Sequence, residues 1–251
     1  MGFTNVLVRI RMVLLFTAVL ALCCFLQAQN PRQDSKNSAI KAAAPFHWGR
    51  VKFGTEEKVG DVWDAHPWAD AHFLTALEKY TNINVDKLWR EVPLEDLDEM
   101  VKFPFLFITG EGWFNLSPLQ KKNIKEYLER GGFLFGDDCV IGNTGDHFYI
   151  SFRKEIEQSF NTEMVKLPAD HAIYHSLYDF NGLPYMQGQN HGGHALFIGK
   201  RMAIFLSPSD LHCGWGSQYL RTTKGNGWFT LEKEEAAVKM GINVIVYAMT
   251  N

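Results

Sequence analysis

Two stretches of the chain, 103–108 and 133–135, are continuous runs of apolar residues that do not alternate with polar ones. Such runs are typical of strands that are buried on both faces of a parallel sheet. Between them, the segment 117–130 has the pattern of an amphipathic helix. A strand, a helix and a second strand with short connections predict a βαβ unit, whose crossover we expect to be right-handed.

The predicted helix over 117–130 carries both start and stop signals. Ser117 is placed to cap the N-terminus, Pro118 stands at the first helical position, and Gln120 completes a capping box. Gly131 is expected to end the helix in a left-handed conformation. The residues expected on the buried side are Leu119, Ile124, Tyr127 and Leu128.

Further elements flank this unit. Residues 46–53 alternate well enough for a first strand, and 86–100 predict a short acidic helix before the next strand. Amphipathic helices are expected over 69–80 and 146–160. The residues expected on their buried sides are Phe73, Leu74, Leu77 and Tyr80 in the first helix, and Phe148, Phe152, Ile156 and Phe160 in the second.

The C-terminal part of the chain adds a hairpin and a last helix. Two apolar runs surround Gly199-Lys200, which predicts an antiparallel hairpin with a tight two-residue turn. Residues 231–249 predict a closing helix, in which Gly241 is expected to allow close packing. The whole pattern predicts an α/β domain, with a mostly parallel central sheet, flanking helices and an antiparallel hairpin at one side.

The first residues have the pattern of a targeting segment. Arg9 and Arg11 precede an apolar run, 12–26, which is short for a membrane span of about 20 residues. Ala28 offers a small residue at a cleavage point. We therefore interpret 1–28 as a secretory signal peptide, with an uncleaved membrane anchor as the alternative.

This interpretation sets the domain organisation. Residues 29–45 are expected to be a flexible linker, and 46–251 a single α/β domain. The protein is then exported, and it is either periplasmic or tethered to the outer face of the inner membrane.

Charge and cysteine content restrict the partners. The 25 Lys and Arg residues are outnumbered by 28 Asp and Glu, and no basic block occurs, which argues against nucleic acid. The remaining expected partners are an envelope protein, a small molecule or a glycan. Cys139 and Cys213 are able to pair in an oxidising compartment, but we expect two separate core thiols, because sequence alone gives no proximity.

Acidic residues follow several of the predicted strands. Glu111, Asp138 and Asp210 each stand just beyond an apolar run. Ligands of open α/β sheets bind beyond the carboxyl ends of the strands. If the strands are parallel neighbours, these acids meet at one edge of the sheet. Carboxylates at such short distances raise one another's pKa or require a nearby positive charge. Arg153 is a candidate for that charge.

Two interpretations of the adjacent acids Asp137 and Asp138 stay open. In one, they belong to a reaction or binding centre at the sheet edge. In the other, they form a turn and a helix cap, as short acidic side chains commonly do. The candidate catalytic residues are Asp137, Asp138, Arg153, His171 and Asp210.

The histidines add two alternatives. In a hydrolase, Asp138 would act as base or nucleophile, His171 or His194 would carry the proton, and Arg153 would orient an anionic substrate. His171 is equally able to cap a helix and pack. In a metal-dependent variant, His191 and His194 would bind zinc together with one rim acid, although local spacing fixes no third ligand. No HExxH, GxSxG, GxGxxG or P-loop pattern occurs, so neither a cofactor nor a metal site is assigned.

Beyond these elements, the chain resembles a bacterial family known as domain of unknown function 4159, whose members have no established activity. The resemblance covers about residues 46–215 in the expected order. The matching stretches are FHWGRVKF, WADAHFLTALEKYT, FPFLFITGEG, YLERGGFLFGDDC, SFRKEIEQSF, LPADHAIYHSLYDF and MAIFLSPSDLHCGW. It implies a three-layer, flavodoxin-like fold of the class I glutamine amidotransferase-like superfamily, usually exported or tethered to a membrane.

The same resemblance gives a test of mechanism. Amidotransferases of this superfamily carry a nucleophilic cysteine at a tight elbow between a strand and a helix, and that position falls on or near Asp138 here. Cys139 is one residue further on, and two carboxylates beside it raise a thiol pKa, which disfavours a thiolate nucleophile. We therefore expect a protein without the thiol triad, with a role in binding or scaffolding at the cell envelope.

Overall fold

The computed structural model describes residues 44–54, 62–140 and 145–251. The chain divides into a unit that ends at Ala44 and a second unit, Pro45–Asn251, and the second unit is the subject below. The predicted signal peptide and nearly all of the predicted linker lie outside the described residues. Within the described residues, no helix has both the length and the apolar character needed to cross a membrane.

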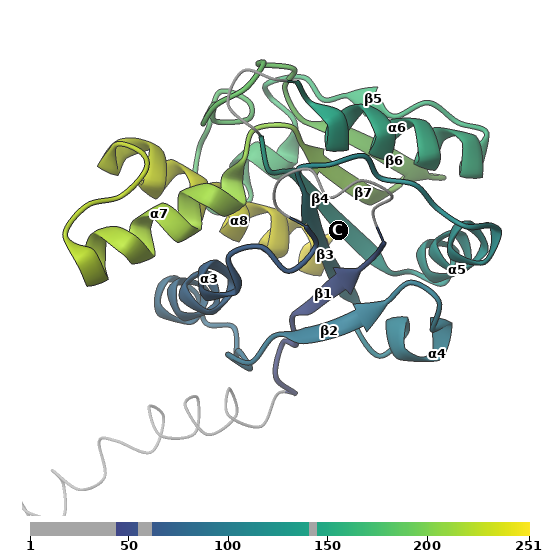
Figure 1. Ribbon diagram of the computed structural model, residues 1–251, viewed down its shortest axis with the longest axis horizontal. Helices are drawn as coiled ribbons and strands as arrows, with labels where there is room; N and C mark the ends of the chain where they lie inside the picture. Colours follow the sequence, from purple (N-terminus) through teal and green to yellow (C-terminus); the bar gives the residue numbers. More distant parts are fainter. Residues whose placement is uncertain (1–43, 55–61, 141–144) are drawn as a thin grey trace, which may run out of the picture. The chain divides into compact units, whose positions relative to one another are not determined.

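The centre of the fold is a seven-stranded sheet with the order β2-β1-β3-β4-β7-β6-β5 (Figure 1). Its strands are β1 (Gly49–Lys52), β2 (Arg90–Pro93), β3 (Phe105–Gly110), β4 (Phe133–Asp138), β5 (Val165–Lys166), β6 (His194–Ile198) and β7 (Arg201–Ser207). The pairs β1–β2, β1–β3, β3–β4 and β4–β7 are parallel, whereas β6 is antiparallel to β7 and β5 to β6. The predicted parallel core with an antiparallel hairpin at one side is confirmed.

Helices cover both faces of the sheet. They are α3 (Pro67–Tyr80), α4 (Leu97–Met100), α5 (Pro118–Glu129), α6 (His147–Phe160), α7 (Leu211–Lys224) and α8 (Leu231–Thr250), with a short 3-10 helix η1 (Ala172–His175). In Figure 1, α3, α7 and α8 lie on one side of the sheet, and α5 and α6 lie on the other. The protein is therefore a three-layer α/β structure.

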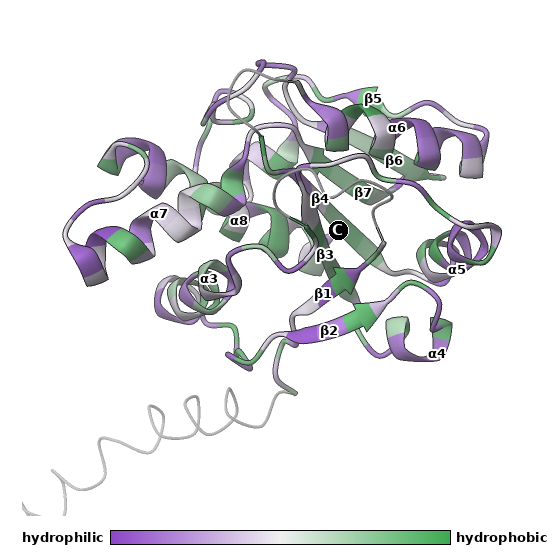
Figure 2. Cartoon of the chain, in the orientation of Figure 1, coloured by the Kyte–Doolittle hydropathy of each residue, from purple (hydrophilic) through white to green (hydrophobic). Residues whose placement is uncertain are grey.

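Successive side chains of the central strands serve two different cores. Phe105 and Phe107 pack with α3, α7 and α8, whereas Leu106 and Ile108 pack with α5 and α6. This alternation explains why residues 105–108 of β3 are all apolar, as the sequence predicts for a strand buried on both faces. Figure 2 shows the same distribution, with hydrophobic residues along the central strands and hydrophilic ones along the outer helix surfaces.

Several details of the predicted helices are confirmed. Ser117 and Gln120 form the capping box of α5 in both directions, and Gly131 after it has φ 106. Gly199 in the β6–β7 turn has φ 63, as the tight turn requires. Gly241 lies in close packing, because a Cβ there would stand 2.7 Å from both Phe73 and Trp215.

Other details of the predicted helices and strands are wrong. Leu119 and Tyr80 were expected on buried helix faces, but they are 50% and 49% exposed. Each lies at a helix end, where the apolar face is no longer covered. The segment 86–100 contains the strand β2 as well as the short helix, and the pattern does not predict α7. Strand β2 pairs only with β1 at the sheet edge, so its sequence lacks the apolar run of a central strand.

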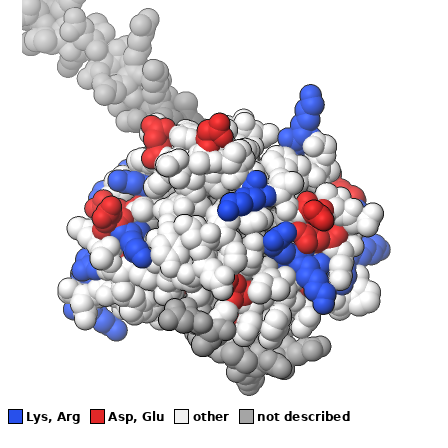
Figure 3. All heavy atoms as spheres, turned by 90° about the horizontal axis from the view of Figure 1, so that it is seen from above, with Lys and Arg blue, Asp and Glu red and all other residues white. Residues whose placement is uncertain are grey.

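On the face seen from above, charged side chains are spread out rather than concentrated. In the view from above (Figure 3), acidic and basic side chains are interspersed, and neither sign forms a continuous patch on that face. The acids that matter for the site are not among the exposed ones, because Asp137, Asp138 and Asp210 are buried.

Candidate functional site at the carboxyl ends of the strands

Acids at the carboxyl ends of β3, β4 and β7 meet at one edge of the sheet. Gly110, which precedes Glu111, pairs with Asp138, and Asp137 pairs with Ser207 of β7. The three strands are parallel neighbours, so their carboxyl ends point the same way. The predicted convergence of acidic residues is therefore confirmed as geometry, and it creates a candidate site at this edge.

Asp137 binds the N-terminus of α7. Its carboxyl oxygens accept hydrogen bonds from the backbone N–H groups of Leu211 at 3.1 Å and His212 at 2.8 Å. The pKa of Asp137 is raised to about 8, first by burial and then by the carboxyl of Asp210, against the opposing effect of these hydrogen bonds. Asp137 thus caps a helix, as one interpretation predicted, but that helix is α7, far away in sequence, and not a turn directly after Asp138.

Asp138 is only half satisfied. Its Oδ2 accepts a hydrogen bond from the backbone N–H of Tyr149 in the first turn of α6, at 3.2 Å. Its Oδ1 is buried and has no hydrogen-bond partner among the described residues. Burial raises the pKa of Asp138 well above its usual value, and the carboxyls of Asp137, Asp146 and Asp210 raise it further. Both interpretations of this residue therefore hold in part, because one oxygen caps a helix and the other has no partner.

Asp210 stands at the joint between β7 and α7 in a left-handed conformation, with φ 63 and ψ 47. It caps α7, accepting the backbone N–H of Cys213 at 3.4 Å, and it accepts a hydrogen bond from the amide of Gln187. Its pKa is raised to about 6, chiefly by burial, although these hydrogen bonds oppose the shift. Positive φ at a residue other than glycine marks a joint whose geometry is fixed by its surroundings.

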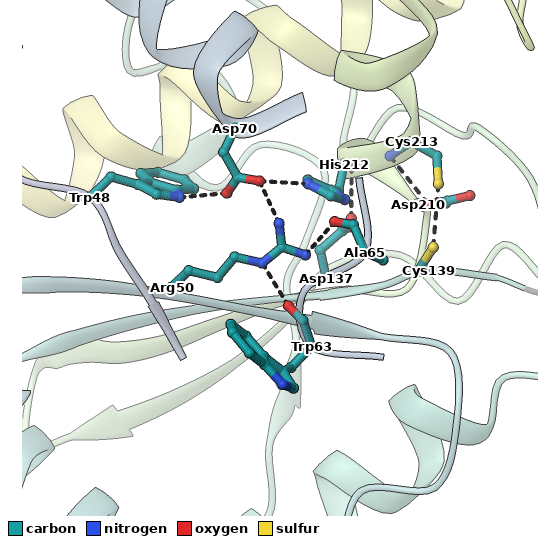
Figure 4. A network of polar contacts seen from close by, with 10 residues as sticks. All are labelled: Trp48, Arg50, Trp63, Ala65, Asp70, Asp137, Cys139, Asp210, His212 and Cys213. Atoms are coloured by element: carbon teal, nitrogen blue, oxygen red, sulfur yellow. Dashed lines mark hydrogen bonds and ion pairs between the residues drawn. The ribbon is translucent and has the colours of Figure 1, made fainter. Parts of the chain in front are cut away.

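A buried ion-pair network adjoins these acids, to which His212 connects it (Figure 4). Arg50 of β1 pairs with Asp70 of α3 at 2.5 Å, and both side chains are fully buried. Asp70 also accepts hydrogen bonds from Trp48 at 2.7 Å and from His212 of α7, whose Nε2 lies 3.1 Å away. Burial alone would raise the pKa of Asp70, but Arg50 and His212 outweigh it, so the pKa is lowered.

Arg50 also fixes the loop that leads into α3. Its guanidinium donates to the backbone carbonyl oxygens of Trp63 at 2.7 Å and of Ala65 at 2.6 Å. The network therefore ties β1, this loop, α3 and the start of α7 together at the carboxyl edge. The sequence pattern does not predict this network. The sequence did contain one signal for it. Asp70 precedes Phe73 by three residues and Leu74 by four, so it lies on the same, buried face of the predicted helix.

The two cysteines lie next to each other. Cys139 Sγ and Cys213 Sγ are 3.3 Å apart, and both thiols are free and buried. The expectation of two separate core thiols is wrong, because the end of β4 and the first turn of α7 meet here. The pKa of the Cys139 thiol is raised well above its usual value, by the hydrogen bond with Cys213, by burial and by nearby carboxylates. The direction agrees with the expectation from its acidic neighbours.

Arg153 and His171 lie in other surroundings. Arg153 pairs with Glu157 at 2.8 Å and donates to the hydroxyl of Tyr149 at 3.1 Å. No ion pair between Arg153 and the rim acids occurs among the described residues, so its expected role as their counter-charge is wrong. His171 caps η1, accepting the backbone N–H of Ile173 at 3.2 Å, which is the capping role that the sequence left open.

His191, in the loop before β6, and His194, the first residue of β6, do not converge on a rim acid. His191 Nε2 lies 2.6 Å from Asp146, whereas His194 Nε2 lies 3.3 Å from the hydroxyl of Tyr149. His194 Nδ1 faces the carbonyl of Gly192 at 3.0 Å. Within the described part of the chain, these two imidazoles and an acid do not form a group with metal-binding spacing.

Fold and site together define an α/β protein with a mostly parallel sheet, whose strand ends carry buried acids, a thiol pair and an arginine-centred network. The family model for the domain of unknown function DUF4159 matches residues 47–249, so the chain belongs to that family. The match covers β1 to α8 and therefore the whole site. A search of curated proteins finds no match to the chain.

Proposed function

We propose that this protein is an exported ligand-binding protein of the class I glutamine amidotransferase-like superfamily that lacks the thiol mechanism. Strand order supports the superfamily. The five parallel strands run β2-β1-β3-β4-β7, which corresponds to the flavodoxin-like order 2-1-3-4-5 with β7 as the fifth strand. The basic and apolar pattern of residues 9–28 supports export to the envelope, as a periplasmic or membrane-tethered protein.

One observation carries the binding proposal. Asp138 Oδ1 is buried without a partner among the described residues. The carboxyls of Asp137, Asp146 and Asp210 are near enough to raise the pKa of Asp138. An unsatisfied buried polar atom costs about 1–3 kcal/mol, so this oxygen favours a ligand that completes its hydrogen bond.

The chemistry of this oxygen indicates the class of ligand. A carboxyl oxygen beside further acids suits a molecule that presents hydrogen-bond donors and no negative charge. We therefore propose a small ligand that carries hydroxyl or ammonium groups, such as a saccharide. A partner protein that inserts a polar side chain is the alternative occupant, which the small-molecule test below would fail to find.

Thermal unfolding with panels of neutral saccharides and of small amines tests the proposal. A binding compound at a hundred times its Kd stabilises the protein by about 2.7 kcal/mol. We expect such a shift in the wild type and in Glu129→Gln, an exposed control, but not in Asp138→Asn. Equal shifts in the wild type and Asp138→Asn, or no shift with either panel, would contradict the proposal.

Absence of the thiol mechanism has its own test. The raised pKa of Cys139 and its hydrogen bond with Cys213 disfavour a thiolate nucleophile. We expect no glutamine hydrolysis above background in the wild type or in Cys139→Ala. Hydrolysis by the wild type that disappears in Cys139→Ala would contradict the proposal.

Export is tested by cell fractionation and N-terminal sequencing. We expect the protein in the envelope fraction, with a mature chain that begins at Gln29.

The unpartnered oxygen of Asp138 also favours a second candidate, a hydrolase in which this residue acts on the bound molecule. A binding protein leaves its ligand unchanged, whereas the hydrolase would convert it. Incubating any compound that the panels identify, with product analysis by mass spectrometry, separates the two. Conversion that is lost in Asp138→Asn would establish the hydrolase.

A further inference from the structure

A histidine and both cysteines of the described region gather at the same edge of the sheet. His66, Cys139 and Cys213 each offer one ligand atom, and all three atoms lie within 4.8 Å of one another. They come from the loop before α3, the end of β4 and the first turn of α7. We propose that these three residues form a binding site for a thiophilic divalent cation, zinc(II).

The distances fit one tetrahedral ion. Zinc binds thiolate sulfur at about 2.3 Å and imidazole nitrogen at about 2.0–2.1 Å, so two ligand atoms on one tetrahedral zinc are about 3.6–3.8 Å apart. The two sulfurs lie 3.3 Å apart, which small rotations of the two side chains adjust. Two thiolates and an imidazole are the donor set that selects zinc over magnesium or calcium.

His66 is held in position by its surroundings. It has a left-handed backbone, φ 48 and ψ 53, at the N-cap of α3, yet its side chain makes no capping hydrogen bond. Its ring lies 5.1 Å from that of Trp68 and 4.9 Å from that of Trp228. The carbonyl of the preceding residue, Ala65, accepts a hydrogen bond from Arg50 at 2.6 Å. Helix capping thus does not account for this left-handed conformation, which places a ring nitrogen of His66 within 4.8 Å of both sulfurs.

The charge around the thiols suits a cation. Glu111 Oε1 lies 3.9 Å from Cys139 Sγ, and the carboxyl of Asp210 accepts the backbone N–H of Cys213. Binding replaces two S–H protons with one zinc ion and releases both protons to solvent. Three protein ligands leave the fourth position for water or a substrate atom, as in catalytic zinc sites. The inference goes beyond the proposed binding function, because it rests on different side chains.

Zinc content and affinity of the full chain test the inference. Protein purified under reducing conditions without chelator is titrated with zinc(II) against a chromophoric competitor, and with cobalt(II) to detect thiolate coordination by its charge-transfer absorption. We expect one equivalent of zinc. Loss of an outer-shell partner alone weakens zinc binding about 10–100-fold, so we expect about 100-fold or more for Cys139→Ser, Cys213→Ser and His66→Gln.

Controls separate this site from the proposed ligand site. His175→Gln, an exposed histidine, is expected to retain zinc. If only the zinc site is absent, the Tm shifts that the ligand panels produce in the wild type persist although no zinc binds. If only the ligand site is absent, zinc still binds and neither panel shifts the Tm of the wild type. X-ray absorption of the zinc-loaded wild type needs no variant to fold, and we expect two sulfur ligands at about 2.3 Å.

Three results would overturn the inference. One is equal zinc affinity in the wild type and the three ligand variants. Another is a zinc spectrum with only oxygen and nitrogen ligands. The third is a Cys139–Cys213 disulfide that forms with saturating zinc present, because bound thiolates would be protected from oxidation.

Discussion

Arg50 and Asp70 form an ion pair at 2.5 Å in which both side chains are fully buried. A buried ion pair is not by itself stabilising, because both charges lose their hydration. Here the pair is completed by Trp48 and His212 on the carboxylate and by two backbone carbonyls on the guanidinium. Its effect is to fix β1, the loop before α3 and the start of α7 relative to one another, behind the acidic edge.

Arg50→Lys is expected to destabilise the protein severely. A single ammonium group cannot reach Asp70 and the two carbonyls that the planar guanidinium binds together. We expect the free energy of unfolding to fall by about 3 kcal/mol in denaturant titrations, because the two carbonyls would lose their hydrogen bonds at about 1–3 kcal/mol each. The matched control is Arg90→Lys, at the exposed pair with Asp86, with an expected change of about 0.5 kcal/mol or less. Similar losses in both variants would contradict the account.

Gly241→Ala is expected to destabilise the protein although alanine is the better helix former. The added Cβ would stand 2.7 Å from Phe73 and from Trp215, both in the core. Overpacking of this kind costs about 1–3 kcal/mol, which exceeds the gain of about 1 kcal/mol in helix propensity. Thermal unfolding checks the sign, with the exposed Glu235→Ala of the same helix as control. A higher Tm for Gly241→Ala would show that α8 moves away freely.

His194 is expected to make stability depend on pH. Its pKa is lowered from 6.5 to about 4, by burial and then by Arg153, with smaller effects from Lys166 and His191. In the unfolded chain the His194 imidazole binds a proton near pH 6.5, whereas in the folded protein it binds one only near pH 4.

The contribution of neutral His194 to the free energy of unfolding is therefore complete above pH 6.5, and it is lost as the pH falls toward 4. We expect that loss to reach about 2 kcal/mol. Unfolding titrations at several pH values should show a flatter profile for His194→Gln than for the wild type. Parallel profiles would contradict the assignment.

Much of the fold could be predicted from local pattern. Strand β3 and helix α5 carry unmistakable signals, because burial on both faces removes polar residues and the capping box marks the helix start. Strand β2 and helix α7 carry weaker ones. An edge strand needs no apolar run, and the N-cap of α7, Asp210, has a left-handed backbone rather than the extended one usual at this position.

The site was predictable only where strand ends determine it. Asp138 and Asp210 converge because their strands are parallel neighbours, which the apolar runs indicate. The contacts of Arg50 with Asp70 and of Cys139 with Cys213 join segments far apart in sequence, so no local spacing predicts them. Arg153 was misassigned because its partner Glu157 is one helical turn away on the same helix, a nearer choice than the sheet edge.

We propose that Asp138 is retained for a ligand, whereas Asp70 is retained for the fold. Denaturant unfolding of Asp138→Asn and Asp70→Asn, without ligand, distinguishes these two roles. Asparagine at 138 keeps an oxygen for the N–H of Tyr149 and removes a buried acid from its acidic neighbours, so we predict a gain of about 1 kcal/mol. Asparagine at 70 leaves Arg50 uncompensated, and we predict a loss of about 3 kcal/mol. Comparable losses in both variants would contradict the account, because Asp138 would then be a structural cap.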